Sequence, residues 1–250
     1  MNFNKIVIKN SCILVIVLFL SFSCNEVTEG LRFSNNNTVD FFAEKKTISN
    51  IEKKFIRNSL IDIQTLSSGI KVSLAYASEN NFTGINLYGS LNKCYLPGSV
   101  AMKLAAAQDS LQAIFPGFSL LVLDATRPQS IQQMMWDSCK VHVAVRAKYL
   151  ARPVYKSMHN YGAAIDLTIV DDSGKELDMG TPFDFFDELA EPRLEFVFLN
   201  QGKLSLKQVE NRKLLRKVMT CAGFIPISNE WWHFEAGSRR WATENLKLIE

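Results

Sequence analysis

Two short polar motifs limit the folds open to this chain, because their side chains form a useful site only if they meet. The first spans residues 157–166 (SMHNYGAAID) and the second is EWWH at residues 230–233. A catalytic zinc site takes three His, Asp, Glu or Cys ligands, leaves one position for water and needs a nearby carboxylate to move the proton. The motifs therefore predict a zinc hydrolase whose three ligands and one base are His159, Asp166, His233 and Glu230.

The histidine content favours this interpretation over two separate structural histidines. The chain has 3 histidines, and two of them, His159 and His233, fall within the two motifs. The third, His142, has no acidic or cysteine partner in a metal-binding spacing. We expect His142 to lie on a helix as a structural or surface residue.

The N-terminal segment is typical of an exported protein. Two lysines precede an uncharged, apolar stretch over residues 10–23, which is short for a membrane span and has the layout of a secretory signal. The residues before Cys24 also resemble a bacterial lipoprotein cleavage site, although Phe22 stands where a smaller side chain is usual. We expect a signal peptide over residues 1–23, lipidation of Cys24 and a periplasmic or outer-membrane lipoprotein. Ordinary export with cleavage near Ser23, or an uncleaved anchor, stays open.

The charge and the cysteine spacing argue against a nucleic-acid-binding surface and against a zinc site made of cysteines. The formal net charge of +3 falls to +1 when the two lysines of residues 1–23 are removed, and no basic stripe suggests nucleic-acid binding. The exported body keeps Cys94, Cys139 and Cys221, and none of them forms a Cys-x-x-Cys pair. We expect small buried side chains with at most one disulfide, whose pairing stays open.

One folded domain follows a polar segment. Residues 24–60 are predicted as a polar, irregular tether, and residues 61–250 as the catalytic domain. A chain of 250 residues with 47% hydrophobic content is long enough for one substantial core.

Hydrophobic periodicity within this domain indicates an α+β fold, with a central, mostly antiparallel sheet flanked by helices. Gly162 lets the chain turn, so that His159 folds back toward Asp166. Arg127 lies at a strand-to-helix junction before Pro128. Glu230 shares a site with His233 only if the chain bends or Glu230 precedes the last strand. The predicted strands and helices are at 70–76, 100–114, 118–123, from 128 onward, 163–170, 206–222 and 231–235.

Five ordered blocks, over about residues 70–236, resemble the D-Ala-D-Ala dipeptidases of the VanX type within the zinc D,D-peptidases. The double tryptophan of the last block is the most specific to the dipeptidases. The resemblance implies the hedgehog/D,D-peptidase-like zinc fold. The blocks are Tyr76 with NFTG at 81–84, DATRP at 124–128, SMHNYGAAID at 157–166, MGTPFD at 179–184 and EWWH at 230–233.

The resemblance also implies an activity: hydrolysis of D-Ala-D-Ala to two D-alanines, with one Zn²⁺ per chain. Arg127 matches the family arginine that faces the developing oxyanion. Tyr76 and Asp184 match residues that receive the substrate's ammonium group, and Ser157 matches one that hydrogen-bonds the dipeptide. Asp184 could instead cap a following helical segment. Asp124 either orients Arg127 or caps the next helix.

Two departures from the family pattern keep other functions open. The run between Arg127 and His159 is shorter than in the resistance dipeptidases, which predicts a rebuilt pocket wall. An exported enzyme would meet peptidoglycan fragments and free dipeptides, which favours peptidoglycan turnover or D-alanine scavenging over resistance. The alternatives are a zinc D,D-carboxypeptidase or endopeptidase on longer stem peptides, and a non-catalytic zinc-binding module of the hedgehog type.

Overall fold

The computed structural model describes residues 27–33, 39–45, 48–142 and 146–250. The predicted signal peptide and Cys24 lie outside these residues. The chain divides into two compact units, at residues 1–48 and 49–250, and each is described by itself. In the first unit, β1 (Val27–Phe33) and β2 (Val39–Lys45) pair antiparallel. The sequence indicates an irregular tether in this region, but the Val, Leu and Phe residues of both segments suit paired strands.

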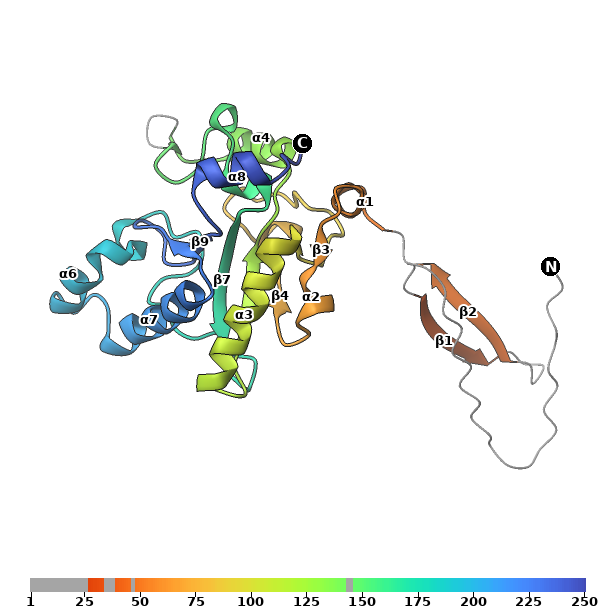
Figure 1. Ribbon diagram of the computed structural model, residues 1–250, viewed down its shortest axis with the longest axis horizontal. Helices are drawn as coiled ribbons and strands as arrows, with labels where there is room; N and C mark the ends of the chain where they lie inside the picture. The colour runs from red at the N-terminus through yellow and green to blue at the C-terminus, as the bar shows by residue number, and fades with distance from the viewer. Residues whose placement is uncertain (1–26, 34–38, 46–47, 143–145) are drawn as a thin grey trace. The chain divides into compact units, whose positions relative to one another are not determined.

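The second unit contains a five-stranded sheet in the order β4-β6-β7-β9-β8. Figure 1 labels three of these strands, β4, β7 and β9. Only the β4–β6 pair is parallel, and the other neighbours run antiparallel. This arrangement confirms the predicted α+β class with a mostly antiparallel sheet. The strands are β4 (Lys71–Val72), β6 (Ser119–Asp124), β7 (Ala164–Val170), β8 (Ile225–Pro226) and β9 (His233–Glu235).

Two long helices and one face of this sheet form the main core. Helix α3 (Gly98–Ile114) packs against β6 and against α7 (Leu206–Cys221). Alternate residues of β7, Ile165, Leu167 and Ile169, lie in the same fully buried cluster as residues of both helices. Because side chains alternate along a strand, Asp166 and Thr168 face the other side of the sheet. The helices thus cover one face and leave the opposite face for polar groups.

A β-bulge in β6 places an acidic residue on that polar face. Val122 pairs with Leu167, but Asp124 pairs with Asp166, so the register shifts between Val122 and Asp124. Strict alternation would point Asp124 to the same face as Val122, which is packed in the core. An extra residue at a bulge reverses the following side chain, and Asp124 therefore lies beside Asp166.

Shorter elements complete the second unit, and among them is a two-stranded sheet of β3 and β5. No helix within the described residues is both long and apolar enough to cross a membrane. The elements are α1 (Asn50–Arg57), β3 (Ile61–Asp62), α2 (Ile63–Leu66), β5 (Tyr95–Leu96), α4 (Gln129–Ser138), α6 (Glu195–Asn200) and α8 (Arg239–Asn245), with 3₁₀ turns at Ala75–Ala77, Pro153–Tyr155, Met158–Tyr161, Glu188–Ala190 and Pro192–Leu194.

Two local predictions are wrong. The strand predicted over 70–76 is limited to β4, and Tyr76 lies in a 3₁₀ turn. The apolar residues there are buried in two different clusters, with Ile70 in the main core and Tyr76 in a second one, rather than along one strand. His142 lies beyond the end of α4, so it is not on a helix.

The three cysteines of the second unit are free thiols in the structure. Cys94 and Cys139 are buried in different clusters, and Cys221 is exposed. Burial raises the pKa of the Cys94 thiol well above its ordinary value. Cys94 and Cys139 act as small apolar side chains.

Candidate metal centre and active site

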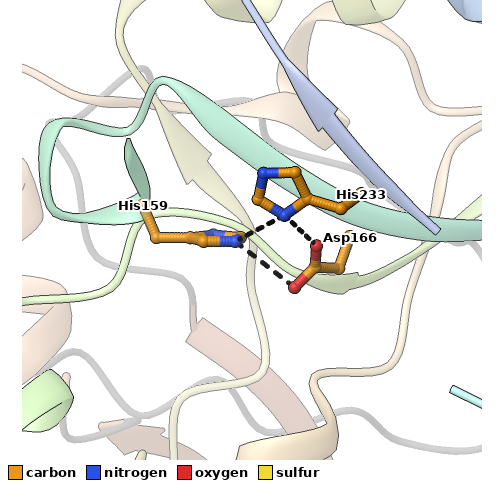
Figure 2. A group of neighbouring side chains, drawn as sticks. All are labelled: His159, Asp166 and His233. Atoms are coloured by element: carbon orange, nitrogen blue, oxygen red, sulfur yellow. Dashed lines mark hydrogen bonds and ion pairs between the residues drawn. The ribbon is translucent and has the colours of Figure 1, made fainter. Parts of the chain in front are cut away.

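Three side chains from separate elements converge on the polar face of the sheet (Figure 2). His159 lies in the 3₁₀ turn before β7, Asp166 lies within β7, and His233 begins β9 directly opposite Asp166. His159 Nε2 is 3.3 Å from both Asp166 Oδ2 and His233 Nδ1, and His233 Nδ1 is 2.9 Å from Asp166 Oδ1. The three predicted ligands thus form one buried cluster.

These spacings fit a divalent metal ion. Donor atoms at about 2.0–2.1 Å from a tetrahedral ion lie about 3.3 Å from one another. His159 Nε2 and His233 Nδ1 are 3.3 Å apart, which matches that spacing, and the Asp166 carboxylate presents one oxygen to each of them. Two imidazoles and one carboxylate leave a fourth position for water, as in catalytic rather than structural sites.

Hydrogen bonds fix which nitrogen of each histidine faces the cluster. His159 Nδ1–H donates to the carbonyl oxygen of Ala125 at 2.7 Å, so Nε2 is the nitrogen that faces Asp166. His233 turns Nδ1 toward Asp166, and its Nε2 lies 3.9 Å from Glu235 Oε1. The site would therefore bind a metal through Nε2 of one histidine and Nδ1 of the other.

The electrostatics show how strongly the three groups interact without a metal. Burial alone would raise the pKa of Asp166, but His159 and His233 lower it well below its ordinary value. Burial alone would lower the pKa of His233, but the neighbouring Asp166 and Glu235 carboxylates raise it to about 10. The cluster thus stabilises positive charge between its members. A bound cation would take the place of these protons.

Glu230 lies beside the cluster without belonging to it. It precedes β9, so the chain brings it to the same side as His233, and its Oε2 lies 3.9 Å from His233 Nδ1. Removal from water raises the pKa of Glu230 to about 7. A carboxyl group with a pKa near neutrality is suited to accept and return a proton at that pH.

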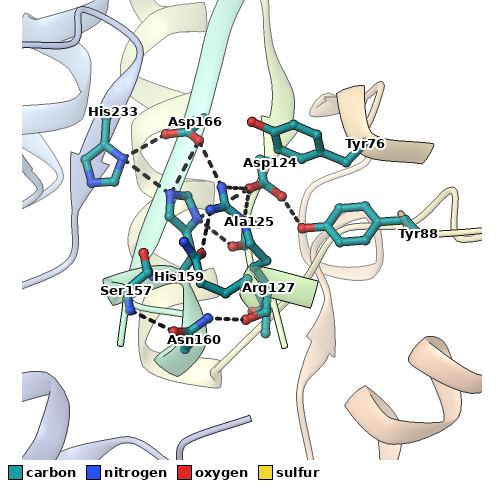
Figure 3. A network of polar contacts seen from close by, with 12 residues as sticks. Tyr76, Tyr88, Asp124, Ala125, Arg127, Ser157, His159, Asn160, Asp166 and His233 are labelled. Carbon is teal, nitrogen blue, oxygen red and sulfur yellow. Dashed lines mark hydrogen bonds and ion pairs between the residues drawn. The ribbon is translucent and has the colours of Figure 1, made fainter. Parts of the chain in front are cut away.

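Arg127 is held at the other side of the cluster by a buried network (Figure 3). Its Nε donates to Asp124 Oδ2 at 2.9 Å and its Nη1 to Gln132 Oε1 at 2.8 Å. Its Nη2 also contacts Asp124 and lies 3.9 Å from Asp166 Oδ2. Asp124 in turn accepts from the Tyr88 hydroxyl at 2.5 Å. Asp124 therefore orients Arg127 and does not cap α4, whose N-cap is Pro128.

The loop before β7 is fixed by hydrogen bonds between the Asn160 side chain and two backbone groups. The backbone N–H of Ser157 donates to Asn160 Oδ1 at 2.7 Å, and Asn160 Nδ2 donates to the carbonyl oxygen of Arg127 at 2.8 Å. Gly162 ends the turn with φ +62°, and a Cβ there would lie 2.6 Å from Pro97 Cδ. Only glycine fits that position without strain. The loop thus holds His159 and the Arg127 backbone in one unit.

Tyr76 and Asp184 meet on a third side of the site. The Tyr76 hydroxyl donates to Asp184 Oδ2 at 2.8 Å, and the Arg127 guanidinium lies 5.3 Å from the Tyr76 ring centre. Removal from water raises the pKa of Asp184 well above its ordinary value. No ion pair neutralises Asp184 within the described part of the chain. The cap of the nearby 3₁₀ turn is Asp187, so Asp184 does not cap it.

Helix α7 holds the loop that carries Asp184. Arg212 is fully buried and donates from Nε to the Met179 carbonyl oxygen at 2.6 Å and from Nη2 to the Leu189 carbonyl oxygen at 3.1 Å. These two carbonyl groups lie on either side of Asp184 in the sequence. A buried guanidinium thus fixes both ends of this loop.

The cluster, Glu230, Arg127, Tyr76 and Asp184 line one cavity of about 240 Å³. Trp232 forms part of its wall, and the neighbouring Trp231 is buried with Nε1–H donating to Thr181 Oγ1 at 2.8 Å. Residues 147–151 and the aromatic rings of Phe82 and Phe186 also line it. The cavity brings together every site residue predicted from the sequence within the described chain: Tyr76, Arg127, Ser157, His159, Asp166, Asp184, Glu230 and His233.

Sequence reasoning missed the residues that support this site. Tyr88, Gln132 and Arg212 lie outside the five blocks, and nothing in their local sequence signals their contacts. Asn160 does carry a signal, because it stands three residues after Ser157, the spacing of a side-chain cap at a helix start.

This α+β fold and its buried His, Asp and His cluster, with a glutamate and an arginine beside it, define a metallopeptidase. A model of the D-Ala-D-Ala dipeptidase family (peptidase M15) matches residues 56–249. The chain belongs to that family of metal-dependent peptidases.

Curated relatives agree with this assignment. The chain is 34% identical over 176 residues to a D-alanyl-D-alanine dipeptidase of Escherichia coli (strain K12), over 70% of this chain and 83% of the relative. It is 28% identical over 195 residues to a D-alanyl-D-alanine dipeptidase of Enterococcus faecalis, over 72% of this chain and 92% of the relative. A third dipeptidase of that name, from Synechocystis, is 29% identical over 171 residues, with coverage of 57% and 69%.

Proposed function

We propose that this enzyme hydrolyses D-Ala-D-Ala to two molecules of D-alanine and uses one zinc ion held by His159, Asp166 and His233. The observation that carries the proposal is the position of Glu230. Its carboxylate lies 3.9 Å from a ligand nitrogen, and its pKa of about 7 suits a base at neutral pH. Two imidazoles and one carboxylate in a hydrolase make zinc the usual metal.

The chain's own residues divide the chemistry between them. A zinc ion held by His159, Asp166 and His233 would supply a water of lowered pKa and would polarise the peptide carbonyl. Glu230 accepts the proton of the attacking water and delivers it to the departing amine. The Arg127 guanidinium stays charged in a buried setting and stabilises the negative charge that develops on the carbonyl oxygen.

The cavity also supports a small substrate with a free amino group. Its volume of about 240 Å³ is below the ~300–1,000 Å³ typical of pockets for drug-sized ligands. Asp184 has no cation partner among the described residues, and an unneutralised carboxylate removed from water favours an incoming ammonium group. Tyr76 and Asp184 would receive the substrate's N-terminus, and Ser157 would hydrogen-bond the rest of the dipeptide.

The proposal is tested by D-alanine release from zinc-loaded full-length enzyme. One assay contains D-Ala-D-Ala, and another contains a pentapeptide that ends in D-Ala-D-Ala. We expect release from the dipeptide, loss of at least about a hundredfold in kcat in Glu230→Gln, and no loss in the exposed control Glu188→Gln. Release from the pentapeptide alone would instead indicate a D,D-carboxypeptidase. Bound zinc without release from either peptide would indicate a binding module.

The cellular location is proposed from the sequence alone. The apolar stretch over residues 10–23 followed by Cys24 supports an exported lipoprotein that meets wall fragments and free dipeptides. We expect radiolabelled palmitate to enter the wild-type chain in bacteria and not the Cys24→Ala variant. Equal labelling of both, or of neither, would contradict the lipid anchor.

A further inference from the structure

The cavity is also lined by cationic side chains that have no role in the proposed chemistry. A dipeptide is a zwitterion, so a site selective for free dipeptides needs a cation for the substrate's carboxylate as well as an anion for its ammonium group. Arg127 is committed to Asp124 and to the reacting carbonyl. Two other cations line the cavity, Lys148 and Arg239.

Lys148 already has an anionic partner. Its Nζ lies 3.4 Å from Glu191 Oε1, and the Glu191 side chain is only 2% exposed. Arg239, in contrast, makes no ion pair with a carboxylate in the described residues. Its Nη1 donates to the carbonyl oxygens of Tyr155 at 3.3 Å and Lys156 at 3.1 Å, which leaves Nε and Nη2 available.

The position of Arg239 matches the carboxylate end of a bound dipeptide. Arg239 is anchored to the backbone at the residue directly before Ser157, and both residues line the cavity. Helix α8, which begins at Arg239, packs against the 3₁₀ turn that carries His159. Figure 3 shows Ser157 and Tyr76 on opposite sides of His159 and Arg127. Ser157 and Arg239 therefore lie away from the Tyr76–Asp184 pair.

Glu235 lines the cavity as well and is close to Arg239 in the sequence. Glu235 is placed toward His233, with its Oε1 3.9 Å from Nε2, and no ion pair joins it to Arg239. Glu235 therefore leaves the Arg239 guanidinium open to a ligand.

We propose that Arg239 is a specificity-determining residue that binds the C-terminal carboxylate of the substrate. The inference rests on the proposed function and deepens it. Arginine suits this role, because its planar fork donates two parallel hydrogen bonds to a carboxylate. A requirement for a free carboxylate next to the scissile bond limits the length of the substrate at its C-terminus. Asp184 limits its length at the N-terminus in the same way.

The test compares two substrates with three variants of the full-length enzyme. The substrates are D-Ala-D-Ala and its C-terminal amide, which lacks the negative charge. Arg239→Met removes the charge and keeps the aliphatic stem, Arg239→Lys keeps the charge, and Arg240→Met is the matched control. Arg240 is the next residue in the chain, is exposed and pairs with Glu244 on α8 at 2.8 Å.

We expect Arg239→Met to lower kcat/KM for D-Ala-D-Ala about tenfold, mainly through KM, and to change the amide less than about twofold. Arg239→Lys should keep part of the preference for the free carboxylate, and Arg240→Met should keep all of it. An equal loss on both substrates would overturn the inference and assign Arg239 a structural role at the loop, as would no loss on either. If wild-type enzyme cleaves the amide but not D-Ala-D-Ala, or cleaves neither, the proposed function and this inference both fail.

Discussion

Asp166 and His233 are cross-strand partners in the β7–β9 pair, and Asp124 is the partner of Asp166 on its other side, in β6. Three functional side chains thus form one row across three neighbouring strands. Paired positions on adjacent strands point to the same face, so the pairing aligns two candidate metal ligands with the carboxylate that orients Arg127. The bulge in β6 is what brings Asp124 into this row.

The Asp124–Arg127 pair gives the first prediction. Asp124→Asn would place an amide where two guanidinium nitrogens contact one carboxylate oxygen. We expect kcat for D-Ala-D-Ala to fall about 10-fold to 100-fold with little change in KM, because the misplaced Arg127 would stabilise the transition state less well. Tyr88→Phe is the control, since it removes one hydrogen bond to Asp124 and keeps the ion pair. An unchanged kcat in Asp124→Asn would show that Arg127 keeps its position without this partner.

Gly162 gives a prediction on stability. Gly162→Ala would add a Cβ 2.6 Å from Pro97 Cδ and 2.7 Å from Thr126 Oγ1, at φ +62°. Strain and overpacking together should lower the free energy of unfolding by about 2–4 kcal/mol. Gly174→Ala is the matched control, because its φ is +81° but nothing lies within 4 Å of the added Cβ. Denaturant unfolding of both variants measures the difference, and equal losses would contradict the close packing at residue 162.

Glu230 gives a prediction on pH dependence in the metal-free protein. Its folded-state pKa of about 7 is above the ordinary value of 4.5, so the folded state disfavours the charged carboxylate. Stability from this group is complete below pH 4.5 and is lost as the pH rises through about 7. Between about pH 5 and about pH 8, wild type should lose about 2 kcal/mol more than Glu230→Gln. Parallel pH profiles of the two proteins in denaturant unfolding would show that Glu230 has an ordinary pKa.

The sequence predicts the long helices and the buried strand β7 of this fold well. The helices at 98–114 and 206–221 and strand β7 follow from their hydrophobic spacing. The strand expected at 70–76 fails because burial of Tyr76 comes from packing in a second cluster, which apolar alternation alone does not distinguish from a strand. The final helix α8, which carries Arg239, was not predicted either.

The sequence likewise predicts some of the site residues and not others. The residues of the two motifs meet because each motif is compact and contains its own turn. Gly162 positions His159, and the segment before β9 positions Glu230. The role of Asp124 could not be decided from sequence, since its direction depends on a bulge that exists only in the pairing of β6 with β7. The role of Arg212 could not be predicted for a similar reason, because its partners are backbone carbonyl groups of a distant loop.

The most direct test of the account is a zinc titration of metal-free, full-length enzyme, with D-alanine release from D-Ala-D-Ala as the readout. The His159, Asp166 and His233 centre predicts no release in chelator, a linear rise with added zinc and a plateau at one ion per chain. Asp166→Asn should shift the titration to much higher zinc concentrations, because it removes the one anionic ligand. Full activity in the presence of chelator, or no release at any zinc concentration, would contradict the account.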